Sequence, residues 1–375
     1  MRILQLGKYY PPDIGGIESL VMHLTEELNR RGIRSDVLCA RKKIGSVTER
    51  SRGYQIWRTS SLGTFFSTAI SPAMILRLKK VSTHYNVIHI HHPDPMANLA
   101  LFLVKPKCHL VVHWHSDIVR QKRSLKLYAP LLQWMLRRAD VIIVSSEAYM
   151  RGSAYLQMFR SKVKVIPYGI NADAAHNVSK QDIHNLKKKF DDRKIFLSLG
   201  RLVYYKGLSY LVQATTHLTA DHVIIIAGDG PQRSKLENLA SELGVQNTVF
   251  FAGKLSDTER WAFLHSCEAL VLPSVERSEA FGIVQVEAMA CGKPVISTDI
   301  KHSGVGWVNK NNVTGLVVPP KDPKSLAKAI QTVTQDKKRY NQMCHNSLLR
   351  YQSTFHVDAF IDKVIDTYVD VLADD

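Results

Sequence analysis

The sequence predicts an α/β fold made of two doubly wound domains. Short runs of β-branched and other apolar residues alternate with stretches of helical periodicity, as in RILQLG, SDVLCA and DVIIVSS. Apolar strands that are each followed by a helix are typical of parallel sheets covered on both faces. The same alternation of apolar strands and helical stretches resumes at KIFLSLG. A chain of 375 residues is also too long for one core of ordinary size.

We place the first domain at residues 1–170 and the second at 171–355. The first predicted helix is closed by Gly32 and carries apolar residues on one face, namely Ile17, Leu20, Val21, Leu24 and Leu28. The last segment, 356–375, also has apolar residues at helical spacing. It predicts an amphipathic helix that must cover another surface.

The composition is that of an ordinary globular protein, with 45% hydrophobic and 22% charged residues. Five scattered cysteines with no Cys-x-x-Cys pair indicate reduced thiols and a cytoplasmic setting. The first residues resemble no signal peptide, and no apolar run approaches the ~20 residues of a membrane span. We expect a protein that is soluble or lies on a surface.

The net charge of +17 is unevenly distributed. Residues 1–170 hold 26 Lys and Arg against 10 Asp and Glu, whereas the remainder holds 24 against 23. This asymmetry favours an anionic partner for the first half, unless the basic face is simply solvated. The stretches FFSTAISPAMILRLKK and VRQKRSLKLYAPLLQWMLRR suit an anionic membrane surface, or equally core helices with basic outer faces. A nucleic acid is not expected, because no recognised binding module is evident.

Two motifs follow predicted strands and point to an anionic ligand. In PPDIGGIES, Gly15 and Gly16 precede a helix, where a substrate could approach the backbone closely and helix N–H groups favour an anion. In GRLVYYKG, Arg201 and Lys206 form a pair suited to a diphosphate. A plain tight turn and two solvated cations are the alternatives.

A third motif contains two glutamates eight positions apart. In ERSEAFGIVQVEAMACG, we expect Glu279 in the loop before a helix and Glu287 on its early turns. Eight residues at helical rise span roughly 12 Å, more than the separation of a glycosidase acid/base pair. The pair is better suited to holding opposite ends of an extended ligand. AGDGPQRSKL, which contains Gly228, reads alone as a generic strand-to-helix turn.

Glu279-Ala-Phe-Gly-x4-Glu287 followed by AMACGKPVIST resembles the Glu-x7-Glu signature of family 4 glycosyltransferases. These are retaining, nucleotide-sugar-dependent enzymes with the GT-B fold. PPDIGGIE, VIPYGIN, SLGRLVYYKG, AGDGP and TGLVVPP follow in the family's order, so the resemblance spans nearly the whole chain. It implies two Rossmann-like domains around an interdomain cleft, the first for the acceptor and the second for the donor. It also implies that the C-terminal helix crosses back onto the first domain.

The resemblance further implies the roles of single residues. Glu279 would contact hydroxyls of the donor hexose, and Glu287 the ribose of the nucleotide. Arg201 and Lys206 match the diphosphate-binding pair of the family. The remaining donor-binding residues implied are Gly16, Gly228, Ala280, Phe281, Gly282 and Ile283.

The stretch VVHWHSDIVRQK supplies the residues expected from the first domain. The family places a histidine near the donor sugar here, which is His115 or, as the alternative, His113. The residues expected on the acceptor side are Asp117, which would orient the acceptor, and His113. The predicted catalytic residues are therefore His115, Glu279, Arg201 and Lys206. His-x-His pairs in HIHH and HWH could bind zinc, but the resemblance implies neither a metal ion nor another cofactor.

A finer likeness links HSDIVRQK, PSVERSEAFGIVQ and SGVGWVN to bacterial enzymes that build polysaccharides from GDP-mannose. The function this implies is transfer of mannose, with retention, to a glycan or lipid-linked acceptor in cell-surface polysaccharide (lipopolysaccharide) synthesis. The enzyme would be cytoplasmic or peripheral on the inner face of the membrane. The alternatives are a UDP-sugar-dependent hexosyltransferase, a nucleotide-sugar epimerase of similar fold and an inactive nucleotide-sugar binding protein.

Overall fold

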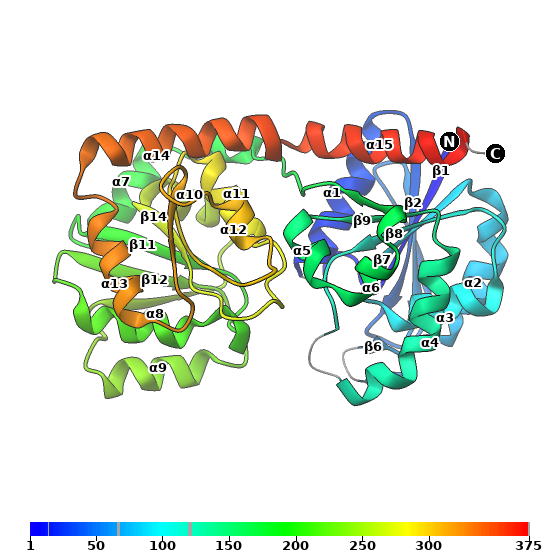
Figure 1. The fold of residues 1–375 in the computed structure, drawn as a ribbon, viewed down its shortest axis with the longest axis horizontal. Coiled ribbons are helices and arrows are strands. Elements are labelled where there is room, and N and C mark those ends of the chain that lie inside the picture. The colour runs from blue at the N-terminus through cyan, green and yellow to red at the C-terminus, as the bar shows by residue number, and fades with distance from the viewer. Residues whose placement is uncertain (14, 66–67, 119–121, 374–375) are drawn as a thin grey trace. The chain divides into compact units, whose positions relative to one another are not determined.

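The structure is a computed structural model that describes residues 1–13, 15–65, 68–118 and 122–373. It divides into two compact units. Unit 1 comprises Met1–Pro167 and Phe360–Asp375, and unit 2 comprises Tyr168–Ala359. Each unit contains one predominantly parallel sheet with helices packed on it, so the predicted α/β class is confirmed (Figure 1).

Unit 1 is built on an eight-stranded sheet in the order β10-β9-β8-β7-β1-β2-β4-β3, parallel except for the β3–β4 pair. Its strands are β1 (Arg2–Gly7), β2 (Arg34–Arg41), β3 (Val47–Ser51), β4 (Tyr54–Ser60), β7 (Val87–His92), β8 (His109–Trp114), β9 (Val141–Val144) and β10 (Val163–Val165). A separate hairpin is formed by β5 (Thr64–Phe65) and β6 (Thr68–Ala69). The helices are α1 (Gly16–Arg30), α2 (Pro72–Val81), α3 (Pro95–Val104), α4 (Lys122–Arg138), α5 (Glu147–Gly152), α6 (Ala154–Met158) and α15 (Val357–Ala373).

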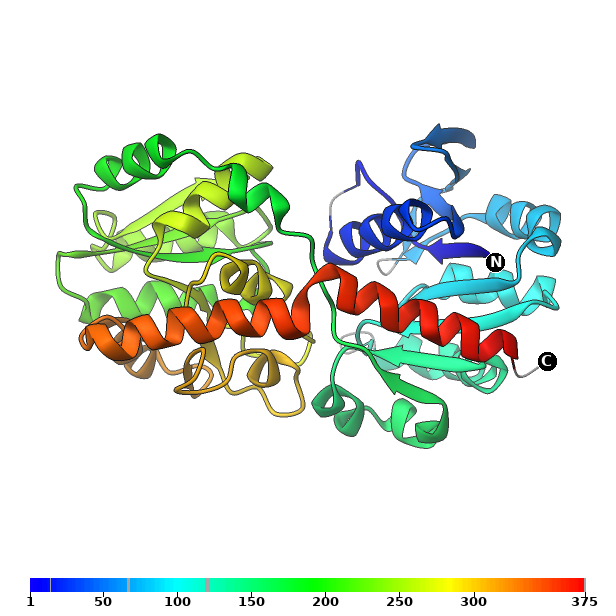
Figure 2. The same ribbon diagram turned by 90° about the horizontal axis from the view of Figure 1, so that it is seen from above.

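The helices of unit 1 cover both faces of its sheet. Right-handed crossovers put α1 on one face and α2, α3 and α4 on the other, because the connections run in opposite directions from β1. The α15 helix lies on the first of these faces, where Tyr368 contacts His89 and Phe360 contacts His113 (Figure 2). The predicted apolar face of α1 is buried through Leu20, Val21, Leu24 and Leu28.

Unit 2 is built on a six-stranded, fully parallel sheet in the order β13-β12-β11-β14-β15-β16. Its strands are β11 (Lys194–Leu199), β12 (His222–Ala227), β13 (Val249–Gly253), β14 (Ala269–Leu272), β15 (Val295–Thr298) and β16 (Gly315–Val318). The helices are α7 (Lys180–Lys189), α8 (Leu208–Ala214), α9 (Arg233–Glu242), α10 (Asp257–Ser266), α11 (Ile283–Ala290), α12 (Val305–Val308), α13 (Pro323–Thr332) and α14 (Lys337–Arg350). Its core is mainly aliphatic, with Ile224, Val271 and Ile296 among its members, and also contains Phe196.

Both sheets reverse their strand order beside their first strand, between β1 and β7 in unit 1 and between β11 and β14 in unit 2. In open parallel sheets, ligands bind outside the carboxyl ends of the strands at this switch point. Arg201 follows β11, and Glu279 follows β14. The fold therefore brings these two loops, far apart in sequence, to the same edge of unit 2.

Candidate active site

Glycines shape the loops that follow β11 and β12. Gly228 has φ +130°, and a Cβ atom there would lie 1.9 Å from the Gly200 carbonyl oxygen. Gly207 has φ +63°, and its Cβ would lie 2.1 Å from the Pro273 carbonyl oxygen. Because glycine has no side chain at either position, the backbones of the loops after β11, β12 and β14 can touch one another, and no L side chain would fit there. The predicted donor residue Gly228 is thus part of the close packing at this edge.

The central feature of the site is a buried ion pair. Lys206 Nζ lies 2.7 Å from Glu279 Oε2, and the Ser274 hydroxyl donates to the same oxygen at 3.1 Å. Burial by itself would lower the pKa of Lys206, but the Glu279 carboxylate outweighs it, so the pKa is raised and the lysine stays charged. Arg201, also predicted here, is exposed on the loop that follows β11. The structure therefore brings two predicted residues, Lys206 and Glu279, into direct contact.

Glu287 has a different cationic partner. It lies on α11, where Arg260 from α10 approaches its Oε1 at 3.2 Å. Burial raises the pKa of Glu287, and the Arg260 guanidinium opposes that rise. The Glu287 carboxylate, whose charge would be costly to bury alone, is accordingly held by an arginine.

The loop that enters α11 is fixed from several sides. Gly282 has φ +73° and precedes the helix, where a Cβ atom would lie 2.6 Å from Leu272 Cδ2. The backbone N–H of Gly304 donates to the Ala280 carbonyl at 2.8 Å, and the Ser303 hydroxyl donates to the Glu279 carbonyl. Phe281 is buried in an aromatic cluster with Tyr168, Trp307 and Phe355. The amides at the start of α11 are thus presented by a rigid loop ending at Ile283, and such amides favour an anion.

In unit 1, the structure distinguishes the two histidines that the sequence left as alternatives. His113 lies within β8 and is fully buried, whereas His115 lies just past the carboxyl end of β8 and is 5% exposed. Gly16 is the first residue of α1, with open space where a side chain would begin. The Asp117 carboxylate accepts hydrogen bonds from Trp114 Nε1 at 2.9 Å and from the Ser153 hydroxyl at 2.8 Å.

The zinc alternative concerns the same histidines. Ring nitrogens of His89, His91 and His113 lie within 4.8 Å of one another. The rings are stacked, however, with 3° between the planes of His89 and His113, and both nitrogens of His91 form hydrogen bonds. Histidines that bind zinc instead direct their nitrogens at one point about 2 Å away. The geometry is that of a stacked hydrogen-bonded row, and independence from metal remains a prediction.

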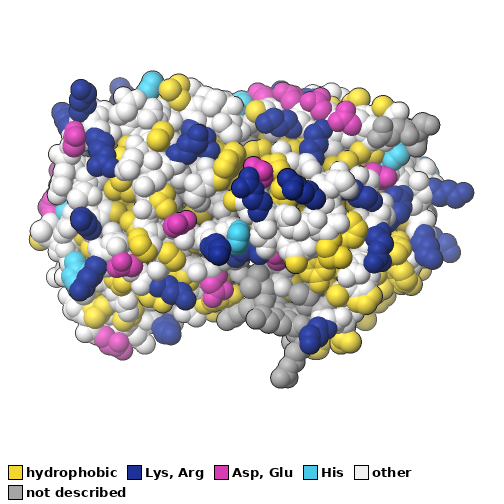
Figure 3. Space-filling model, in the orientation of Figure 1, with side chains coloured by type: hydrophobic (Ala, Val, Ile, Leu, Met, Phe, Trp, Pro, Cys, Tyr) yellow, Lys and Arg dark blue, Asp and Glu magenta, His cyan; other side chains and the backbone are white. Residues whose placement is uncertain are grey.

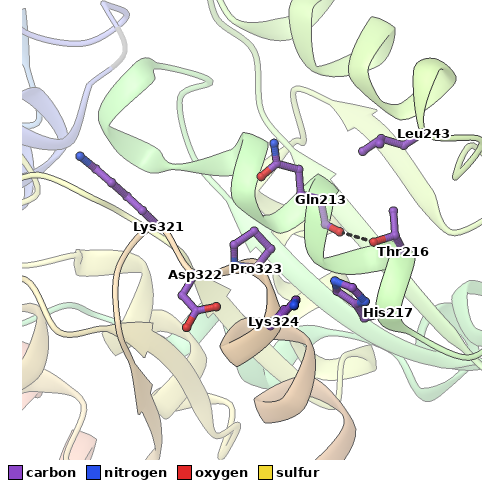
Figure 4. Close-up of a pocket in the computed structure, with 8 residues that line it drawn as sticks. All are labelled: Gln213, Thr216, His217, Leu243, Lys321, Asp322, Pro323 and Lys324. Carbon is purple, nitrogen blue, oxygen red and sulfur yellow. Dashed lines mark hydrogen bonds between the residues drawn. The ribbon is translucent and has the colours of Figure 1, made fainter.

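A separate hollow of about 360 Å³ lies between the end of α8 and the start of α13 in unit 2 (Figure 4). Its lining includes Gln213, Thr216 and Asp322. Figure 4 shows Thr216 donating to the Gln213 carbonyl, and Asp322 caps α13 by accepting from the Ser325 N–H. None of the predicted site residues lines this hollow, so we do not place the substrate in it.

Sequence families match both halves of the chain. Residues 14–174 match Glycosyltransferase Family 4, and residues 179–349 match Glycosyl transferases group 1. The O-antigen chain mannosyltransferase C of Escherichia coli is 32% identical over 375 residues, which is 99% of each chain. The chain belongs to the family 4 glycosyltransferases. Another relative of this glycosyltransferase is the D-rhamnosyltransferase WbpZ of Pseudomonas aeruginosa, 33% identical over 95% of this chain and 92% of the relative.

Solved structures support the GT-B fold of this glycosyltransferase. Sucrose-phosphate synthase from Thermosynechococcus elongatus superimposes with a TM-score of 0.85 over the whole of both chains, at 23% identity. Anabaena HepE in complex with UDP superimposes with a TM-score of 0.78 over 99% of this chain and all of HepE, at 21% identity. The predicted fold and the predicted enzyme class are both confirmed.

Proposed function

We propose that this glycosyltransferase transfers mannose from GDP-mannose, with retention, to a glycan or lipid-linked saccharide in cell-surface polysaccharide synthesis. The names of two relatives, an O-antigen chain mannosyltransferase and a D-rhamnosyltransferase, support the sugar class and the pathway. The observation that carries the reaction is the buried pair of Lys206 and Glu279 at the carboxyl edge of the unit 2 sheet.

The pair combines a cation for the leaving group with a carboxylate for the sugar. Departure of a nucleoside diphosphate leaves negative charge on the phosphates, which Lys206 and Arg201 would stabilise together with the amides at the start of α11. Glu279 would accept hydrogen bonds from hexose hydroxyls. The two charges are paired with each other, so neither is buried alone.

The other predicted donor residues complete the arrangement. Arg260 contacts Oε1 of Glu287, and we assign Oε2 to the ribose hydroxyls. Gly16 and Gly228 allow backbone to approach the phosphates, because neither carries a side chain. His115 would face the donor sugar, and Asp117, whose carboxylate is held by hydrogen bonds from Trp114 and Ser153, would orient the acceptor.

A donor screen tests this proposal. GDP-, UDP- and ADP-sugars are added to the protein, and its melting temperature is followed, because a ligand that binds only the folded state stabilises it. We expect GDP-mannose at 100 times its Kd to add about 2.7 kcal/mol, and a lipid-linked saccharide then to accept mannose. Stabilisation by UDP-sugars alone would refute the donor assignment. Turnover of donor without acceptor would favour an epimerase, and unchanged activity after chelation is expected.

We also propose that unit 1 docks on an anionic membrane surface through α2, α3, α4 and the β5–β6 hairpin. Large apolar side chains are exposed here, among them Leu62 at 76%, Leu76 at 73% and Leu127 at 87%. Figure 3 shows apolar and basic side chains interspersed over the half of the molecule formed by unit 1. The exposed basic residues of these elements and their flanking loops include Lys79, Lys80, Lys105, Lys107 and Lys126.

The acidic residues of this region support the same conclusion. Residues 61–138 hold 11 Lys and Arg but only two acids, Asp94 and Asp117. Asp94 is buried as the cap of α3, and Asp117 binds Trp114 and Ser153. Neither acid offsets the basic side chains, so the surface is complementary to anionic lipid. No helix in the described part of the chain combines the length and the apolar character that a membrane span requires.

Liposome co-sedimentation tests the surface. Each lysine near an anionic bilayer contributes about 1 kcal/mol, so Lys79→Glu with Lys80→Glu should weaken binding to anionic vesicles at least roughly 30-fold. The matched control is Lys337→Glu with Lys338→Glu, the same charge change on exposed residues of α14. Equal binding of both double variants, or equal binding to neutral and anionic vesicles, would refute the docking surface.

A further inference from the structure

The segment that begins helix α12 holds the backbone of the loop that enters α11. The Ser303 hydroxyl donates to the Glu279 carbonyl oxygen, and the Gly304 N–H donates to the Ala280 carbonyl oxygen at 2.8 Å. The same Ser303 hydroxyl accepts from the N–H of Val305, the first residue of α12, at 3.2 Å. Two successive carbonyls of the loop that carries Glu279 are therefore held from the start of α12.

Helix α12 cannot maintain this position by itself. It has only four residues, and isolated helices shorter than about 12–15 residues are marginal in water. The last carbonyls of a helix also lack partners within that helix. In α12 these carbonyls include those of Trp307 and Val308, so this end of the helix needs donors from another element.

Arg350, the last residue of α14, supplies these donors. Its Nη2 donates to the Trp307 carbonyl at 2.7 Å, and its Nε donates to the Val308 carbonyl at 2.9 Å. A cation at the carboxyl end of a helix is favoured by the helix dipole, and the planar guanidinium can donate to two carbonyls at once. Arg350 therefore fixes the end of α12 opposite to the one that holds the loop.

A second path connects Arg350 to the same loop through aromatic rings. The guanidinium lies over the rings of Trp307 and Phe355, 5.0 and 5.1 Å from their centroids. Both rings pack on Phe281, which is buried two residues after Glu279. The backbone path and the aromatic path thus start from one guanidinium and end on successive residues of one loop.

We propose that Arg350 and Ser303 are positioning residues that set the direction of the Glu279 carboxylate through α12. Neither is assigned a contact with the donor, and each acts through the backbone of the loop that enters α11. From this backbone the Glu279 side chain extends to Lys206, whose Nζ lies 2.7 Å from its carboxylate. A displacement of about 1 Å at a reacting group can cost roughly 100-fold in rate. The kinetic role rests on the proposed function, whereas the hold of Arg350 on α12 does not.

The chain offers a matched control for each of these two residues. Arg193 also donates to two backbone carbonyls, those of Phe190 at 3.1 Å and Asn247 at 2.8 Å. The buried Ser347 hydroxyl likewise donates to one backbone carbonyl, that of Thr314, at 3.1 Å. Arg193 and Thr314 directly precede β11 and β16, so both controls lie at the amino edge of the unit 2 sheet, away from the loop that enters α11.

Hydrogen exchange and kinetics of the full chain test the proposal together. Arg350→Met should speed exchange of the Gly304 amide at least about ten-fold and lower kcat/KM for GDP-mannose roughly ten-fold. Ser303→Ala should change both quantities in the same direction. The Kd for GDP should stay unchanged in both variants, because Glu287 rather than Glu279 is proposed to bind the nucleotide.

The control variants separate positioning from stability. Arg193→Met and Ser347→Ala should lower the unfolding free energy about as much as Arg350→Met and Ser303→Ala do, because each removes the same kind of hydrogen bond. Neither control should change exchange of the Gly304 amide or kcat/KM. Controls that lower kcat/KM as strongly as their counterparts would show that the loss reflects stability alone, which would overturn the proposal.

The exchange data and the kinetics can each refute the proposal. A Gly304 amide that exchanges at the wild-type rate in Arg350→Met would show that Arg350 does not hold α12. Faster exchange with wild-type kcat/KM would remove the positioning role. If Arg350→Met does not fold, Ser303→Ala decides whether the contact to the Glu279 carbonyl matters for transfer. If the wild type transfers no sugar at all, the proposed function fails, while the exchange rates still decide whether Arg350 holds α12.

Discussion

Mild acid should unfold unit 1 selectively. Below pH ~6.5 its buried histidines stay neutral in the folded state, whereas the same histidines become charged in the unfolded chain. Burial lowers the pKa of His89, His92 and His115 to about 3 and places those of His91 and His113 well below the usual value. In the unfolded chain each would titrate near about 6.5. The stability that these groups contribute is therefore present above pH ~6.5 and is lost as the pH falls toward their folded pKa values.

The size of this loss of unfolding free energy follows from the difference in proton binding between the folded and unfolded states. At pH 5.5, which is about one unit below the unfolded pKa, protonation of the unfolded state costs the fold roughly 1 kcal/mol for each histidine that stays neutral, or several kcal/mol for the set. Asp94 acts in the opposite direction, because burial raises its folded pKa to about 6, and its protonation in the folded state offsets a small part of the loss. The raised pKa of Glu18 has the same sign. A net loss of several kcal/mol is comparable to the whole stability of a typical domain.

Hydrogen exchange measures this loss within the intact chain. Amides of β7 and β8 report the opening free energy of unit 1 between pH 7.5 and 5.5, after correction for intrinsic rates, and amides of β12 serve as the internal comparison in unit 2. His92→Met should reduce the pH slope by one proton, because neither His92 nitrogen has a hydrogen-bond partner among the described residues. Replacement of the exposed His184 should leave the slope unchanged. A loss below about 2 kcal/mol in the wild type would refute the assignment of neutral buried rings.

The remaining predictions concern unit 2. Gly228→Ala should destabilise this unit by several kcal/mol and abolish donor binding, since its Cβ would lie 1.9 Å from the Gly200 carbonyl oxygen; chemical denaturation and thermal shift measure the two effects. Glu279→Gln keeps the shape but not the charge and should lower kcat/KM at least roughly 100-fold, or about 2.7 kcal/mol, with the fold intact; near-normal kinetics would contradict its donor role. Arg260→Met should cost about 1–2 kcal/mol of unfolding free energy at pH 7.5, a reduced value because the pair is partly exposed. This loss of unfolding free energy should shrink in acid as Glu287 becomes protonated. Urea titrations of the wild type and the variant at two pH values measure it, and a loss that is the same at both pH values would contradict the pairing.

Much of the fold could be predicted because parallel strands carry a strong local signal. Each is a short apolar run followed by helical periodicity, and a ligand site at the carboxyl ends then follows from topology. The helical periodicity that begins after Gly282 predicted that Glu279 precedes α11 and that Glu287 lies on it, and both placements are confirmed.

The partners of these residues could not be predicted, because they depend on packing between distant elements. Arg260 lies 27 positions before Glu287 on another helix, and nothing in its local sequence distinguishes it from a solvated cation. Ser274 is a single serine after β14. The sequence left His113 and His115 as alternatives, and only the length of β8 showed which of them reaches the edge.

The contact between Gly200 and Gly228 restricts how the donor preference of this enzyme can be altered. The two loops meet main chain against main chain, so there is no side chain at that junction to exchange for one of another size or polarity. Selection experiments aimed at a new sugar nucleotide would recover few viable clones there. Libraries directed at positions 276–278 of the adjoining segment, which are not buried, offer far more freedom.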